Sequence, residues 1–177
     1  MRTMDAQSST LLVVDFQAKL MPAIRRGADA IANARRLVDA AALLGVPMFF
    51  TEQNAKGLGP TVRELVRDPA VLTHKMTFDA CREPGFLQRL AEKHAIVVAG
   101  CEAHVCVLQT VLGLIDNGRR VFLVRDALGS RRAESKETAI RRMERHGAEV
   151  VTTEMVVFEW LQTAEHPRFR EAIALIK

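Results

Sequence analysis

The chain has 177 residues, of which 49% are hydrophobic and 26% are charged. This length fits one domain with a substantial core, so residues 1–177 are predicted to form a single domain. The apolar residues fall in short runs, none of them close to the roughly 20 residues that cross a bilayer. Composition therefore points away from a membrane protein, and the first ten residues, which lack an apolar signal region, favour the cytoplasm.

The net charge of +4 and the pI near 9.3 raise the question of a nucleic-acid partner. The basic residues, however, alternate with acidic ones in helical patterns such as ARRLVDA and AIRRMERHGAE, which is typical of a solvated helix face. With no tyrosine and one tryptophan, aromatic side chains for base stacking are scarce. We expect neither a nucleic-acid nor a membrane partner, and instead a small-molecule substrate.

Short apolar runs alternate with helical patterns along the chain, which is typical of βαβ units. The apolar runs are continuous, as expected for strands buried on both faces. Strands are predicted at residues 11–16, 46–51, 95–99, 121–124 and 149–152, with a further edge strand at 71–74. The predicted fold class is α/β: three layers built on a mainly parallel, doubly wound, Rossmann-like sheet.

Helices are predicted between these strands, several of them ended by a glycine. They cover residues 28–44, 85–93, 105–117, 135–146, 155–163 and 167–176. Residues 53–61 (QNAKGLGPT) form a loop with glycines and a proline after a strand, on the side where open α/β sheets bind ligands. This loop is predicted to line or cover a pocket.

Asp15 is an acidic residue inside the otherwise apolar run LLVVDF. A buried carboxylate is costly unless it is paired or hydrogen-bonded, so Asp15 calls for a partner. It is either a functional acid at a strand end or an acid that binds the amides of a neighbouring loop.

Cys106 follows an apolar strand that breaks at Gly100 and turns into a helix. A thiol in the first turn of a helix faces the positive end of the helix dipole, which lowers the thiol pKa and favours a nucleophile. Simple packing is the alternative, because free cysteines are often buried. Cys81 and Cys101 lack this position and are interpreted as structural. Three cysteines without a CxxC spacing are expected to be free thiols in a reducing compartment.

Lys75, in THKMTFDAC, is a lone base after a short apolar run. Taken alone it is interpreted as a surface residue. If it met Asp15 and Cys106 in one crevice, its ammonium would hold the thiol as a thiolate, and the carboxylate could carry the thiol proton to a leaving group.

Three segments together resemble the isochorismatase-like cysteine hydrolases: DFQ at 15–17, HK at 74–75 followed by TFDA, and GCEAHVCVLQT at 100–110. That superfamily includes nicotinamidases and N-carbamoylsarcosine amidase. The resemblance runs from about Leu11 to the C-terminal segment, and the ordered trio is far more specific than any one piece.

The resemblance implies a catalytic triad of Asp15, Lys75 and Cys106. It also implies a cis peptide bond between Cys101 and Glu102, and an oxyanion hole formed by the backbone amides of Glu102 and Cys106. Because Cys101 and Glu102 replace small apolar residues common in nicotinamidases, the Glu102 carboxylate could also turn toward the pocket.

Nicotinamidases of this superfamily bind a metal through an Asp and two His on the loop after the second strand. Here that loop reads TEQNAKGLGPT, so no metal is expected and nicotinamide itself is in doubt. The five histidines show no ligand spacing; His104, close to Cys106, could contact a ligand or serve the helix start. Neither GxGxxG nor GxxxxGK[ST] is present, so no nucleotide cofactor is expected. Members of this superfamily commonly form homo-oligomers, and a homo-oligomer is expected here.

The resulting hypothesis is a hydrolase that cleaves an amide or related carbon–nitrogen bond through a Cys106 thioester. The alternatives are ester or isochorismatase chemistry on the same fold, and a non-enzymatic oligomeric module that binds a partner or senses redox state through Cys106. Five residues near strand ends are predicted to line the substrate pocket: Phe16, Gln17, Gln53, Phe78 and Leu128.

Overall fold

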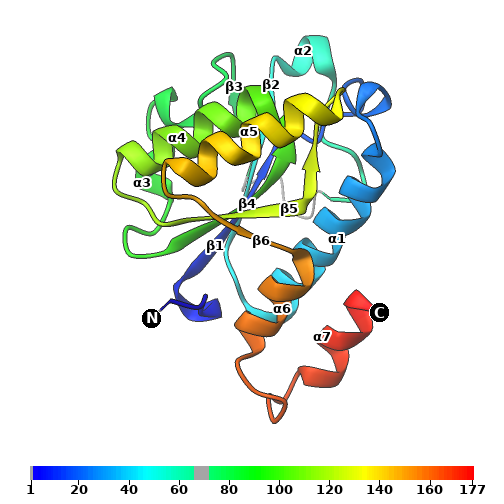
Figure 1. Ribbon diagram of the computed structural model, residues 1–177, viewed down its shortest axis with the longest axis vertical. Helices are drawn as coiled ribbons and strands as arrows, with labels where there is room; N and C mark the ends of the chain where they lie inside the picture. The colour runs from blue at the N-terminus through cyan, green and yellow to red at the C-terminus, as the bar shows by residue number, and fades with distance from the viewer. Residues whose placement is uncertain (1, 66–71) are drawn as a thin grey trace.

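The computed structural model describes residues 2–65 and 72–177. Its centre is a six-stranded sheet of order β3-β2-β1-β4-β5-β6, in which every neighbouring pair is parallel (Figure 1). The strands are β1 (Ser9–Val14), β2 (Met48–Gln53), β3 (Leu72–Lys75), β4 (Ala95–Cys101), β5 (Val121–Gly129) and β6 (Glu149–Val151). The strand order reverses beside β1, and open α/β sheets bind ligands at the carboxyl ends of strands near such a reversal. The α/β prediction is confirmed.

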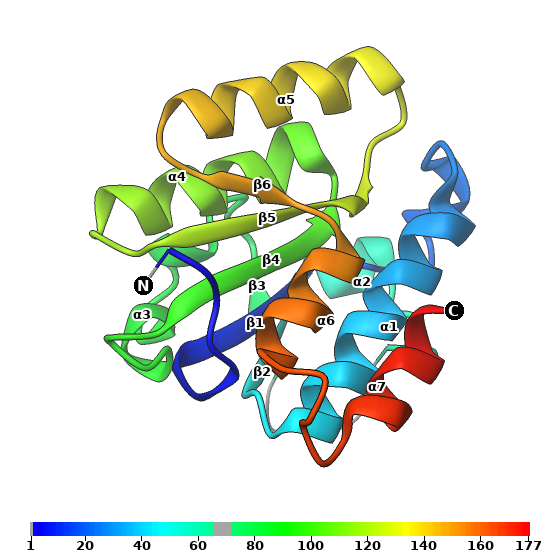
Figure 2. The same ribbon diagram turned by 60° about the horizontal axis from the view of Figure 1, so that its bottom comes forward.

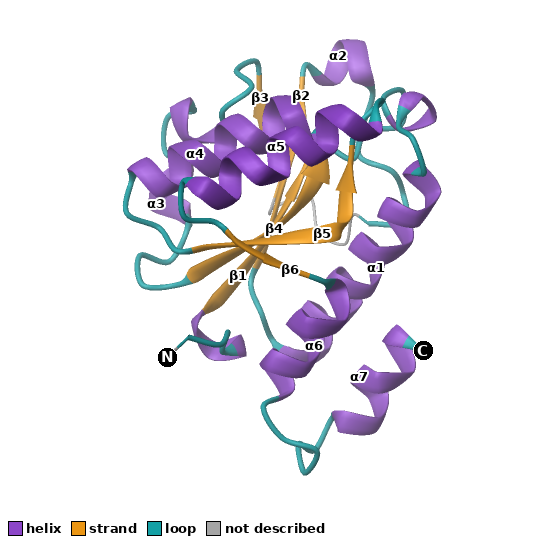
Figure 3. Cartoon of the chain, in the orientation of Figure 1, coloured by secondary structure: helices purple, strands orange, loops and turns teal. Residues whose placement is uncertain are grey.

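Helices cover both faces of this sheet (Figures 2 and 3). On one face lie α1 (Gly27–Leu44), α6 (Thr153–Leu161) and α7 (Phe169–Ile176), and on the other lie α3 (Phe86–Arg89), α4 (Leu108–Asp116) and α5 (Ala133–Arg145). A single turn, α2 (Ala55–Leu58), follows β2. No helix among the described residues is long and apolar enough to cross a membrane.

The central strands divide their side chains between two cores. Leu11 and Val13 of β1 pack under α1 and α6, whereas Leu12 and Val14 pack under α4. All six residues of β1 are buried. Two buried faces explain why the sequence shows continuous apolar runs instead of an alternating pattern.

Several predicted strand boundaries differ from the structure for local reasons. The strand predicted at 11–16 ends at Val14, because Asp15 adopts a left-handed backbone conformation with φ of 51°. The second strand begins after Pro47, which has no N–H to donate to a ladder. β5 extends to Gly129 instead of residue 124, with a shift in its register against β4. Val71, the first residue of the predicted edge strand, lies outside the described residues.

The helix predicted at 105–117 is two elements in the structure. A π-helical turn, Ala103–Val107, precedes α4, so Cys106 lies in this turn and not in the first turn of a regular α-helix. The helix predicted at 85–93 is the single turn α3. α6 begins at Thr153 because the Thr152 hydroxyl caps it by accepting a hydrogen bond from the Met155 amide. The turn α2 was not predicted.

Candidate active site

Asp15, Lys75 and Cys106 come together at the carboxyl edge of the sheet. Asp15 directly follows β1, Lys75 is the last residue of β3, and Cys106 lies in the π-helical turn after β4. Their exposed fractions are only 1%, 3% and 7%. The Lys75 Nζ lies 2.7 Å from the Asp15 Oδ2, and both side chains act on the Cys106 thiol, since Asp15 raises its pKa and Lys75 lowers it. Three ionisable groups from distant parts of the sequence thus form one enclosed cluster.

The Asp15 carboxylate is held by a different partner at each oxygen. Lys75 binds Oδ2, and the Thr51 hydroxyl donates a hydrogen bond of 2.6 Å to Oδ1. The Asp15 amide also donates to the Thr51 carbonyl, at 3.1 Å. Asp tolerates a left-handed conformation better than most residues, which suits it to this strand end. Sequence reasoning missed Thr51, although a polar residue at the end of the apolar run VPMFFT was a usable signal.

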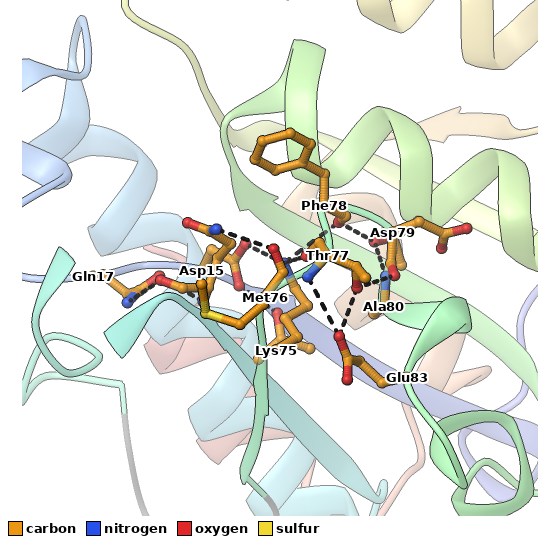
Figure 4. A network of polar contacts seen from close by, with 12 residues as sticks. Asp15, Gln17, Lys75, Met76, Thr77, Phe78, Asp79, Ala80 and Glu83 are labelled. Atoms are coloured by element: carbon orange, nitrogen blue, oxygen red, sulfur yellow. Dashed lines mark hydrogen bonds and ion pairs between the residues drawn. The ribbon is translucent and has the colours of Figure 1, made fainter. Parts of the chain in front are cut away.

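The Lys75 ammonium is also held by the loop that follows β3. Its Nζ donates to the carbonyls of Thr77 and Phe78 at 3.2 and 3.4 Å (Figure 4). The Thr110 hydroxyl of α4 fixes this loop, since it donates to the Phe78 carbonyl and accepts from the Ala80 amide. The ammonium therefore has three oxygen partners in a fixed arrangement.

The turn that carries Cys106 packs closely against β1. A Cβ atom on Gly100 would lie 2.7 Å from both the Val14 Cβ and the Val107 Cγ2, and 2.9 Å from the Val14 carbonyl oxygen. Only glycine fits at such a distance without movement of its neighbours. Gly100 therefore sets how near the turn comes to Asp15.

Burial raises the pKa of the Cys106 thiol to about 12, with a further contribution from the Asp15 charge, while Lys75 acts in the opposite direction. The prediction that the helix dipole and Lys75 hold a thiolate is therefore wrong for this resting state. Desolvation of a thiol that is 7% exposed is the largest influence on this pKa and outweighs the opposing effect of Lys75. A pKa raised in this way favours the neutral thiol for the resting Cys106.

The peptide bond between Cys101 and Glu102 is cis, as predicted. The Glu102 carboxylate accepts hydrogen bonds from the Arg131 Nε at 2.9 Å and the Arg131 amide at 3.4 Å. It is thus bound to the loop after β5. His104 Nδ1 lies 3.1 Å from the Ser130 Oγ on the same loop. Both side chains attach the π-helical turn to that loop.

The five predicted pocket residues divide into two groups. Phe16 and Leu128 are buried in the two cores, at 0% and 1% exposure, so their side chains offer no surface here. Gln17 is also fully buried; its amide bonds the Gln53 backbone and the Gly59 carbonyl, which secures the loop after β2.

Phe78 and Gln53 keep accessible side chains at the site. Phe78 is 47% exposed, and the Gln53 Nε2 donates to the Met76 carbonyl at 3.3 Å. Met76, which sequence reasoning did not select, is 70% exposed beside Lys75 (Figure 4). Its position one residue after Lys75 was the signal that could have identified it.

Two further features of the described residues concern metal binding and the two other cysteines. Within residues 2–65 and 72–177, no cluster of three His, Cys, Asp or Glu side chains could hold a metal ion. Cys81 and Cys101 are free thiols, and Cys101 is fully buried.

Residues 9–155 match the isochorismatase domain family. This chain belongs to that family. Isochorismatase domain-containing protein 2 of Danio rerio is 33% identical over 175 residues, which cover 98% of this chain and 89% of that protein. The Xenopus laevis protein of the same name is 36% identical over 172 residues, covering 96% and 84%. Membership of this family supports hydrolase activity for this chain.

Solved structures share the fold over almost the whole chain. MAR1 ribonuclease from Caenorhabditis elegans has a TM-score of 0.92 at 35% identity, covering 98% of this chain and 92% of that one. The ycaC gene product of Escherichia coli, described as an octameric hydrolase of unknown specificity, has a TM-score of 0.86 at 26% identity, covering 99% and 88%.

Proposed function

We propose that this protein is a cysteine hydrolase that cleaves an amide or related carbon–nitrogen bond of a small molecule. The observation that carries the proposal is the contact of the Cys106 thiol with the Asp15–Lys75 ion pair. A nucleophile beside a base, with the base oriented by a third group, is the arrangement that covalent catalysis requires.

The neutral resting thiol assigns the first step to Asp15. As the Cys106 sulfur attacks the carbonyl carbon, its proton passes to the Asp15 carboxylate, and Lys75 stabilises the sulfur while it loses the proton. The carbonyl π electrons move to the oxygen, which the backbone amides of Glu102 and Cys106 bind. No free thiolate is needed before the substrate arrives.

Breakdown of this intermediate returns the proton. The carbon–nitrogen bond breaks, and the protonated Asp15 gives its proton to the departing nitrogen, which leaves a thioester on Cys106. Asp15 then takes a proton from water, whose oxygen attacks the thioester; the carbon–sulfur bond breaks, and Asp15 reprotonates the thiol. The products are an acid and an amine, and no cofactor is consumed.

Enclosure of the three groups favours a small substrate. Residues that are 7% exposed or less admit a compact group more readily than a folded polymer, and the exposed side chains of Met76 and Phe78, which follow Lys75 in the chain, offer apolar contact. RNA cleavage, suggested by the name of the C. elegans ribonuclease, is the competing activity and is measured alongside. A homo-oligomer is proposed by analogy with the octameric E. coli protein.

The test follows amine release and acyl-enzyme mass for a panel of small amides, with esters and single-stranded RNA for comparison. Wild type is compared with Cys106→Ser, Asp15→Asn and a matched control, Cys81→Ser, whose thiol also has a pKa raised to about 12 by burial. We expect an acyl adduct on Cys106, and turnover lost in the first two variants only.

Iodoacetamide labelling separates the hydrolase from a passive thiol module. Because the Asp15 charge raises the Cys106 pKa, Asp15→Asn should label faster than wild type and yet turn over no amide. Amide hydrolysis that survives Cys106→Ser would refute the proposal. Turnover of esters alone would favour the ester alternative, and absence of every turnover would favour the binding or redox module.

A further inference from the structure

The loop after β3 holds the Lys75 ammonium through two carbonyl groups, yet its large side chains have no core to pack against. Met76 is 70% exposed and Phe78 is 47% exposed. Burial therefore does little to fix the path of this loop, and polar contacts must do so. Thr110 binds one end of it at the Phe78 carbonyl. Thr77, whose carbonyl lies nearer to the Lys75 Nζ, needs a separate anchor.

Glu83 supplies this anchor through a single carboxylate oxygen. Its Oε1 accepts a hydrogen bond of 2.7 Å from the Thr77 hydroxyl and one of 3.4 Å from the Thr77 amide (Figure 4). The hydroxyl also lies 2.8 Å from the Asp79 carbonyl oxygen in the same loop. Hydrogen bonding by the Thr77 hydroxyl lowers the pKa of the Glu83 carboxyl, and the Lys75 charge adds a smaller effect in the same direction. Thr77 is thus held by both its side chain and its backbone.

The backbone of Glu83 is itself fixed, so its carboxylate can act as an anchor. The Glu83 amide donates to the Ala80 carbonyl at 3.1 Å, and the Glu83 carbonyl accepts from the Phe86 amide at 3.1 Å. Phe86 is 1% exposed and belongs to the core under α4. The contacts therefore form a continuous chain from that core through Glu83 and Thr77 to the ammonium of Lys75.

The position of this ammonium matters because it acts on the Cys106 sulfur. Burial and the Asp15 charge raise the Cys106 pKa, and Lys75 is the residue that lowers it. A lysine ammonium is a point charge on a flexible stem, and here Asp15 and the carbonyls of Thr77 and Phe78 are its oxygen partners. If the loop carbonyls move away, the stem can follow them. The effect of the ammonium on the sulfur then weakens, because charge interactions fall with distance.

We propose that Glu83 is a positioning residue, which fixes the Lys75 ammonium beside the Cys106 thiol through Thr77 without touching the substrate. The inference rests on the proposed cysteine hydrolase, in which Lys75 stabilises the sulfur while it loses its proton. What this position requires is a hydrogen-bond acceptor of the right length, and not a negative charge. Sequence reasoning did not select Glu83.

The rate at which iodoacetamide labels Cys106 at mildly alkaline pH, measured by peptide mass spectrometry, reports on the ammonium without any substrate. In Glu83→Leu we expect labelling about threefold to tenfold slower than in wild type, because a displaced ammonium leaves a higher thiol pKa. Glu83→Gln keeps an acceptor for Thr77 and should label at least as fast as wild type. Both variants lose the same negative charge, and that loss alone would speed labelling. Slower labelling in Glu83→Leu would therefore follow from the missing acceptor.

Glu159→Leu is the matched control. Glu159 lies on α6 and accepts a hydrogen bond from the Met4 amide at 2.7 Å, so this variant also removes a carboxylate that binds a backbone amide. Its Cys106 labelling should equal that of wild type. Thr77→Val tests the same link from its other side and should slow labelling, whereas Thr77→Ser, which keeps the hydroxyl, should not.

Catalysis provides a second readout. For an amide that wild type hydrolyses, kcat should fall in Glu83→Leu while KM stays near the wild-type value, since Lys75 acts as the sulfur loses its proton. Labelling needs no substrate, so a failure of the hydrolase proposal leaves this test readable. The inference is overturned if Glu83→Leu and Thr77→Val label Cys106 as fast as wild type or faster, which is what a merely loosened site would show. It is also overturned if Glu83→Gln or Glu159→Leu slows labelling as much as Glu83→Leu does.

Discussion

Replacing Lys75 by methionine should destabilise the protein far more than breaking an ion pair on its surface. The Lys75 and Asp15 side chains are 0% and 1% exposed, and their charged atoms are 2.7 Å apart. Methionine keeps most of the apolar stem but removes the ammonium. The Asp15 carboxylate is then left in the core with the Thr51 hydroxyl as its principal donor.

The expected cost is about 3–5 kcal/mol, because an uncompensated buried charge remains. That is a large share of the roughly 5–15 kcal/mol by which domains are stable. Adding Asp15→Asn to Lys75→Met removes the orphaned charge, so the double variant should cost about 2–3 kcal/mol less than the sum of the single changes. Arg26→Gln, which breaks a pair whose side chains are 79% and 56% exposed, should cost less than about 1 kcal/mol.

Urea denaturation measures these differences through Trp160, the single tryptophan, which is 2% exposed and therefore reports loss of the core. The midpoints and slopes of the four variants are compared with those of wild type. If Lys75→Met proved no more costly than Arg26→Gln, or if the double variant cost the full sum, the Asp15–Lys75 pair would contribute no more to stability than an exposed pair, and the reasoning from its burial would be wrong.

Three further outcomes are expected. Since burial raises the Cys106 pKa to about 12, its rate of labelling by iodoacetamide should rise about tenfold per pH unit from about pH 6 to 9; a plateau near neutrality would contradict the neutral thiol. Gly100→Ala forces a Cβ to 2.7 Å from Val107, so the melting temperature should fall by an amount equivalent to about 1–3 kcal/mol, and an unchanged melting temperature would count against the close packing. Burial also raises the pKa of the Cys101 thiol, whereas in the unfolded chain this thiol titrates near about 9. The free energy of unfolding should therefore fall as pH rises above about 9, and it should fall less steeply in Cys101→Ala. Equal slopes of unfolding free energy against pH in the two proteins would contradict this expectation.

The sheet was predictable from the sequence because its strands have two buried faces, which leaves continuous apolar runs. Boundaries were less predictable where a single backbone angle decides them, as at Asp15, or where a strand continues through polar residues. β5 passes through Arg125 and Asp126, which sequence patterns assign to a loop. The π-helical turn before α4 has no sequence signal that separates it from a regular helix.

Positions near strand ends made Asp15, Lys75 and Cys106 candidates, but only the resemblance to the isochorismatase-like hydrolases implied that the three residues meet. The burial of these three side chains could not be predicted from the sequence, because it depends on how loops far apart in the sequence pack over the carboxyl edge of the sheet. Burial reverses the expected direction of the Cys106 pKa. It also withdraws Phe16 and Leu128 from the surface, although each lies beside a strand end.

The order of the strands has a consequence for refolding. Asp15 follows the first strand of the chain, but Lys75 lies on an edge strand and Cys106 comes only after β4. All three groups can meet only after four strands have paired through long-range contacts, which are slow to form. The urea-induced loss of the Cys106 environment should thus track the whole sheet, and during renaturation this environment should be among the last features to return.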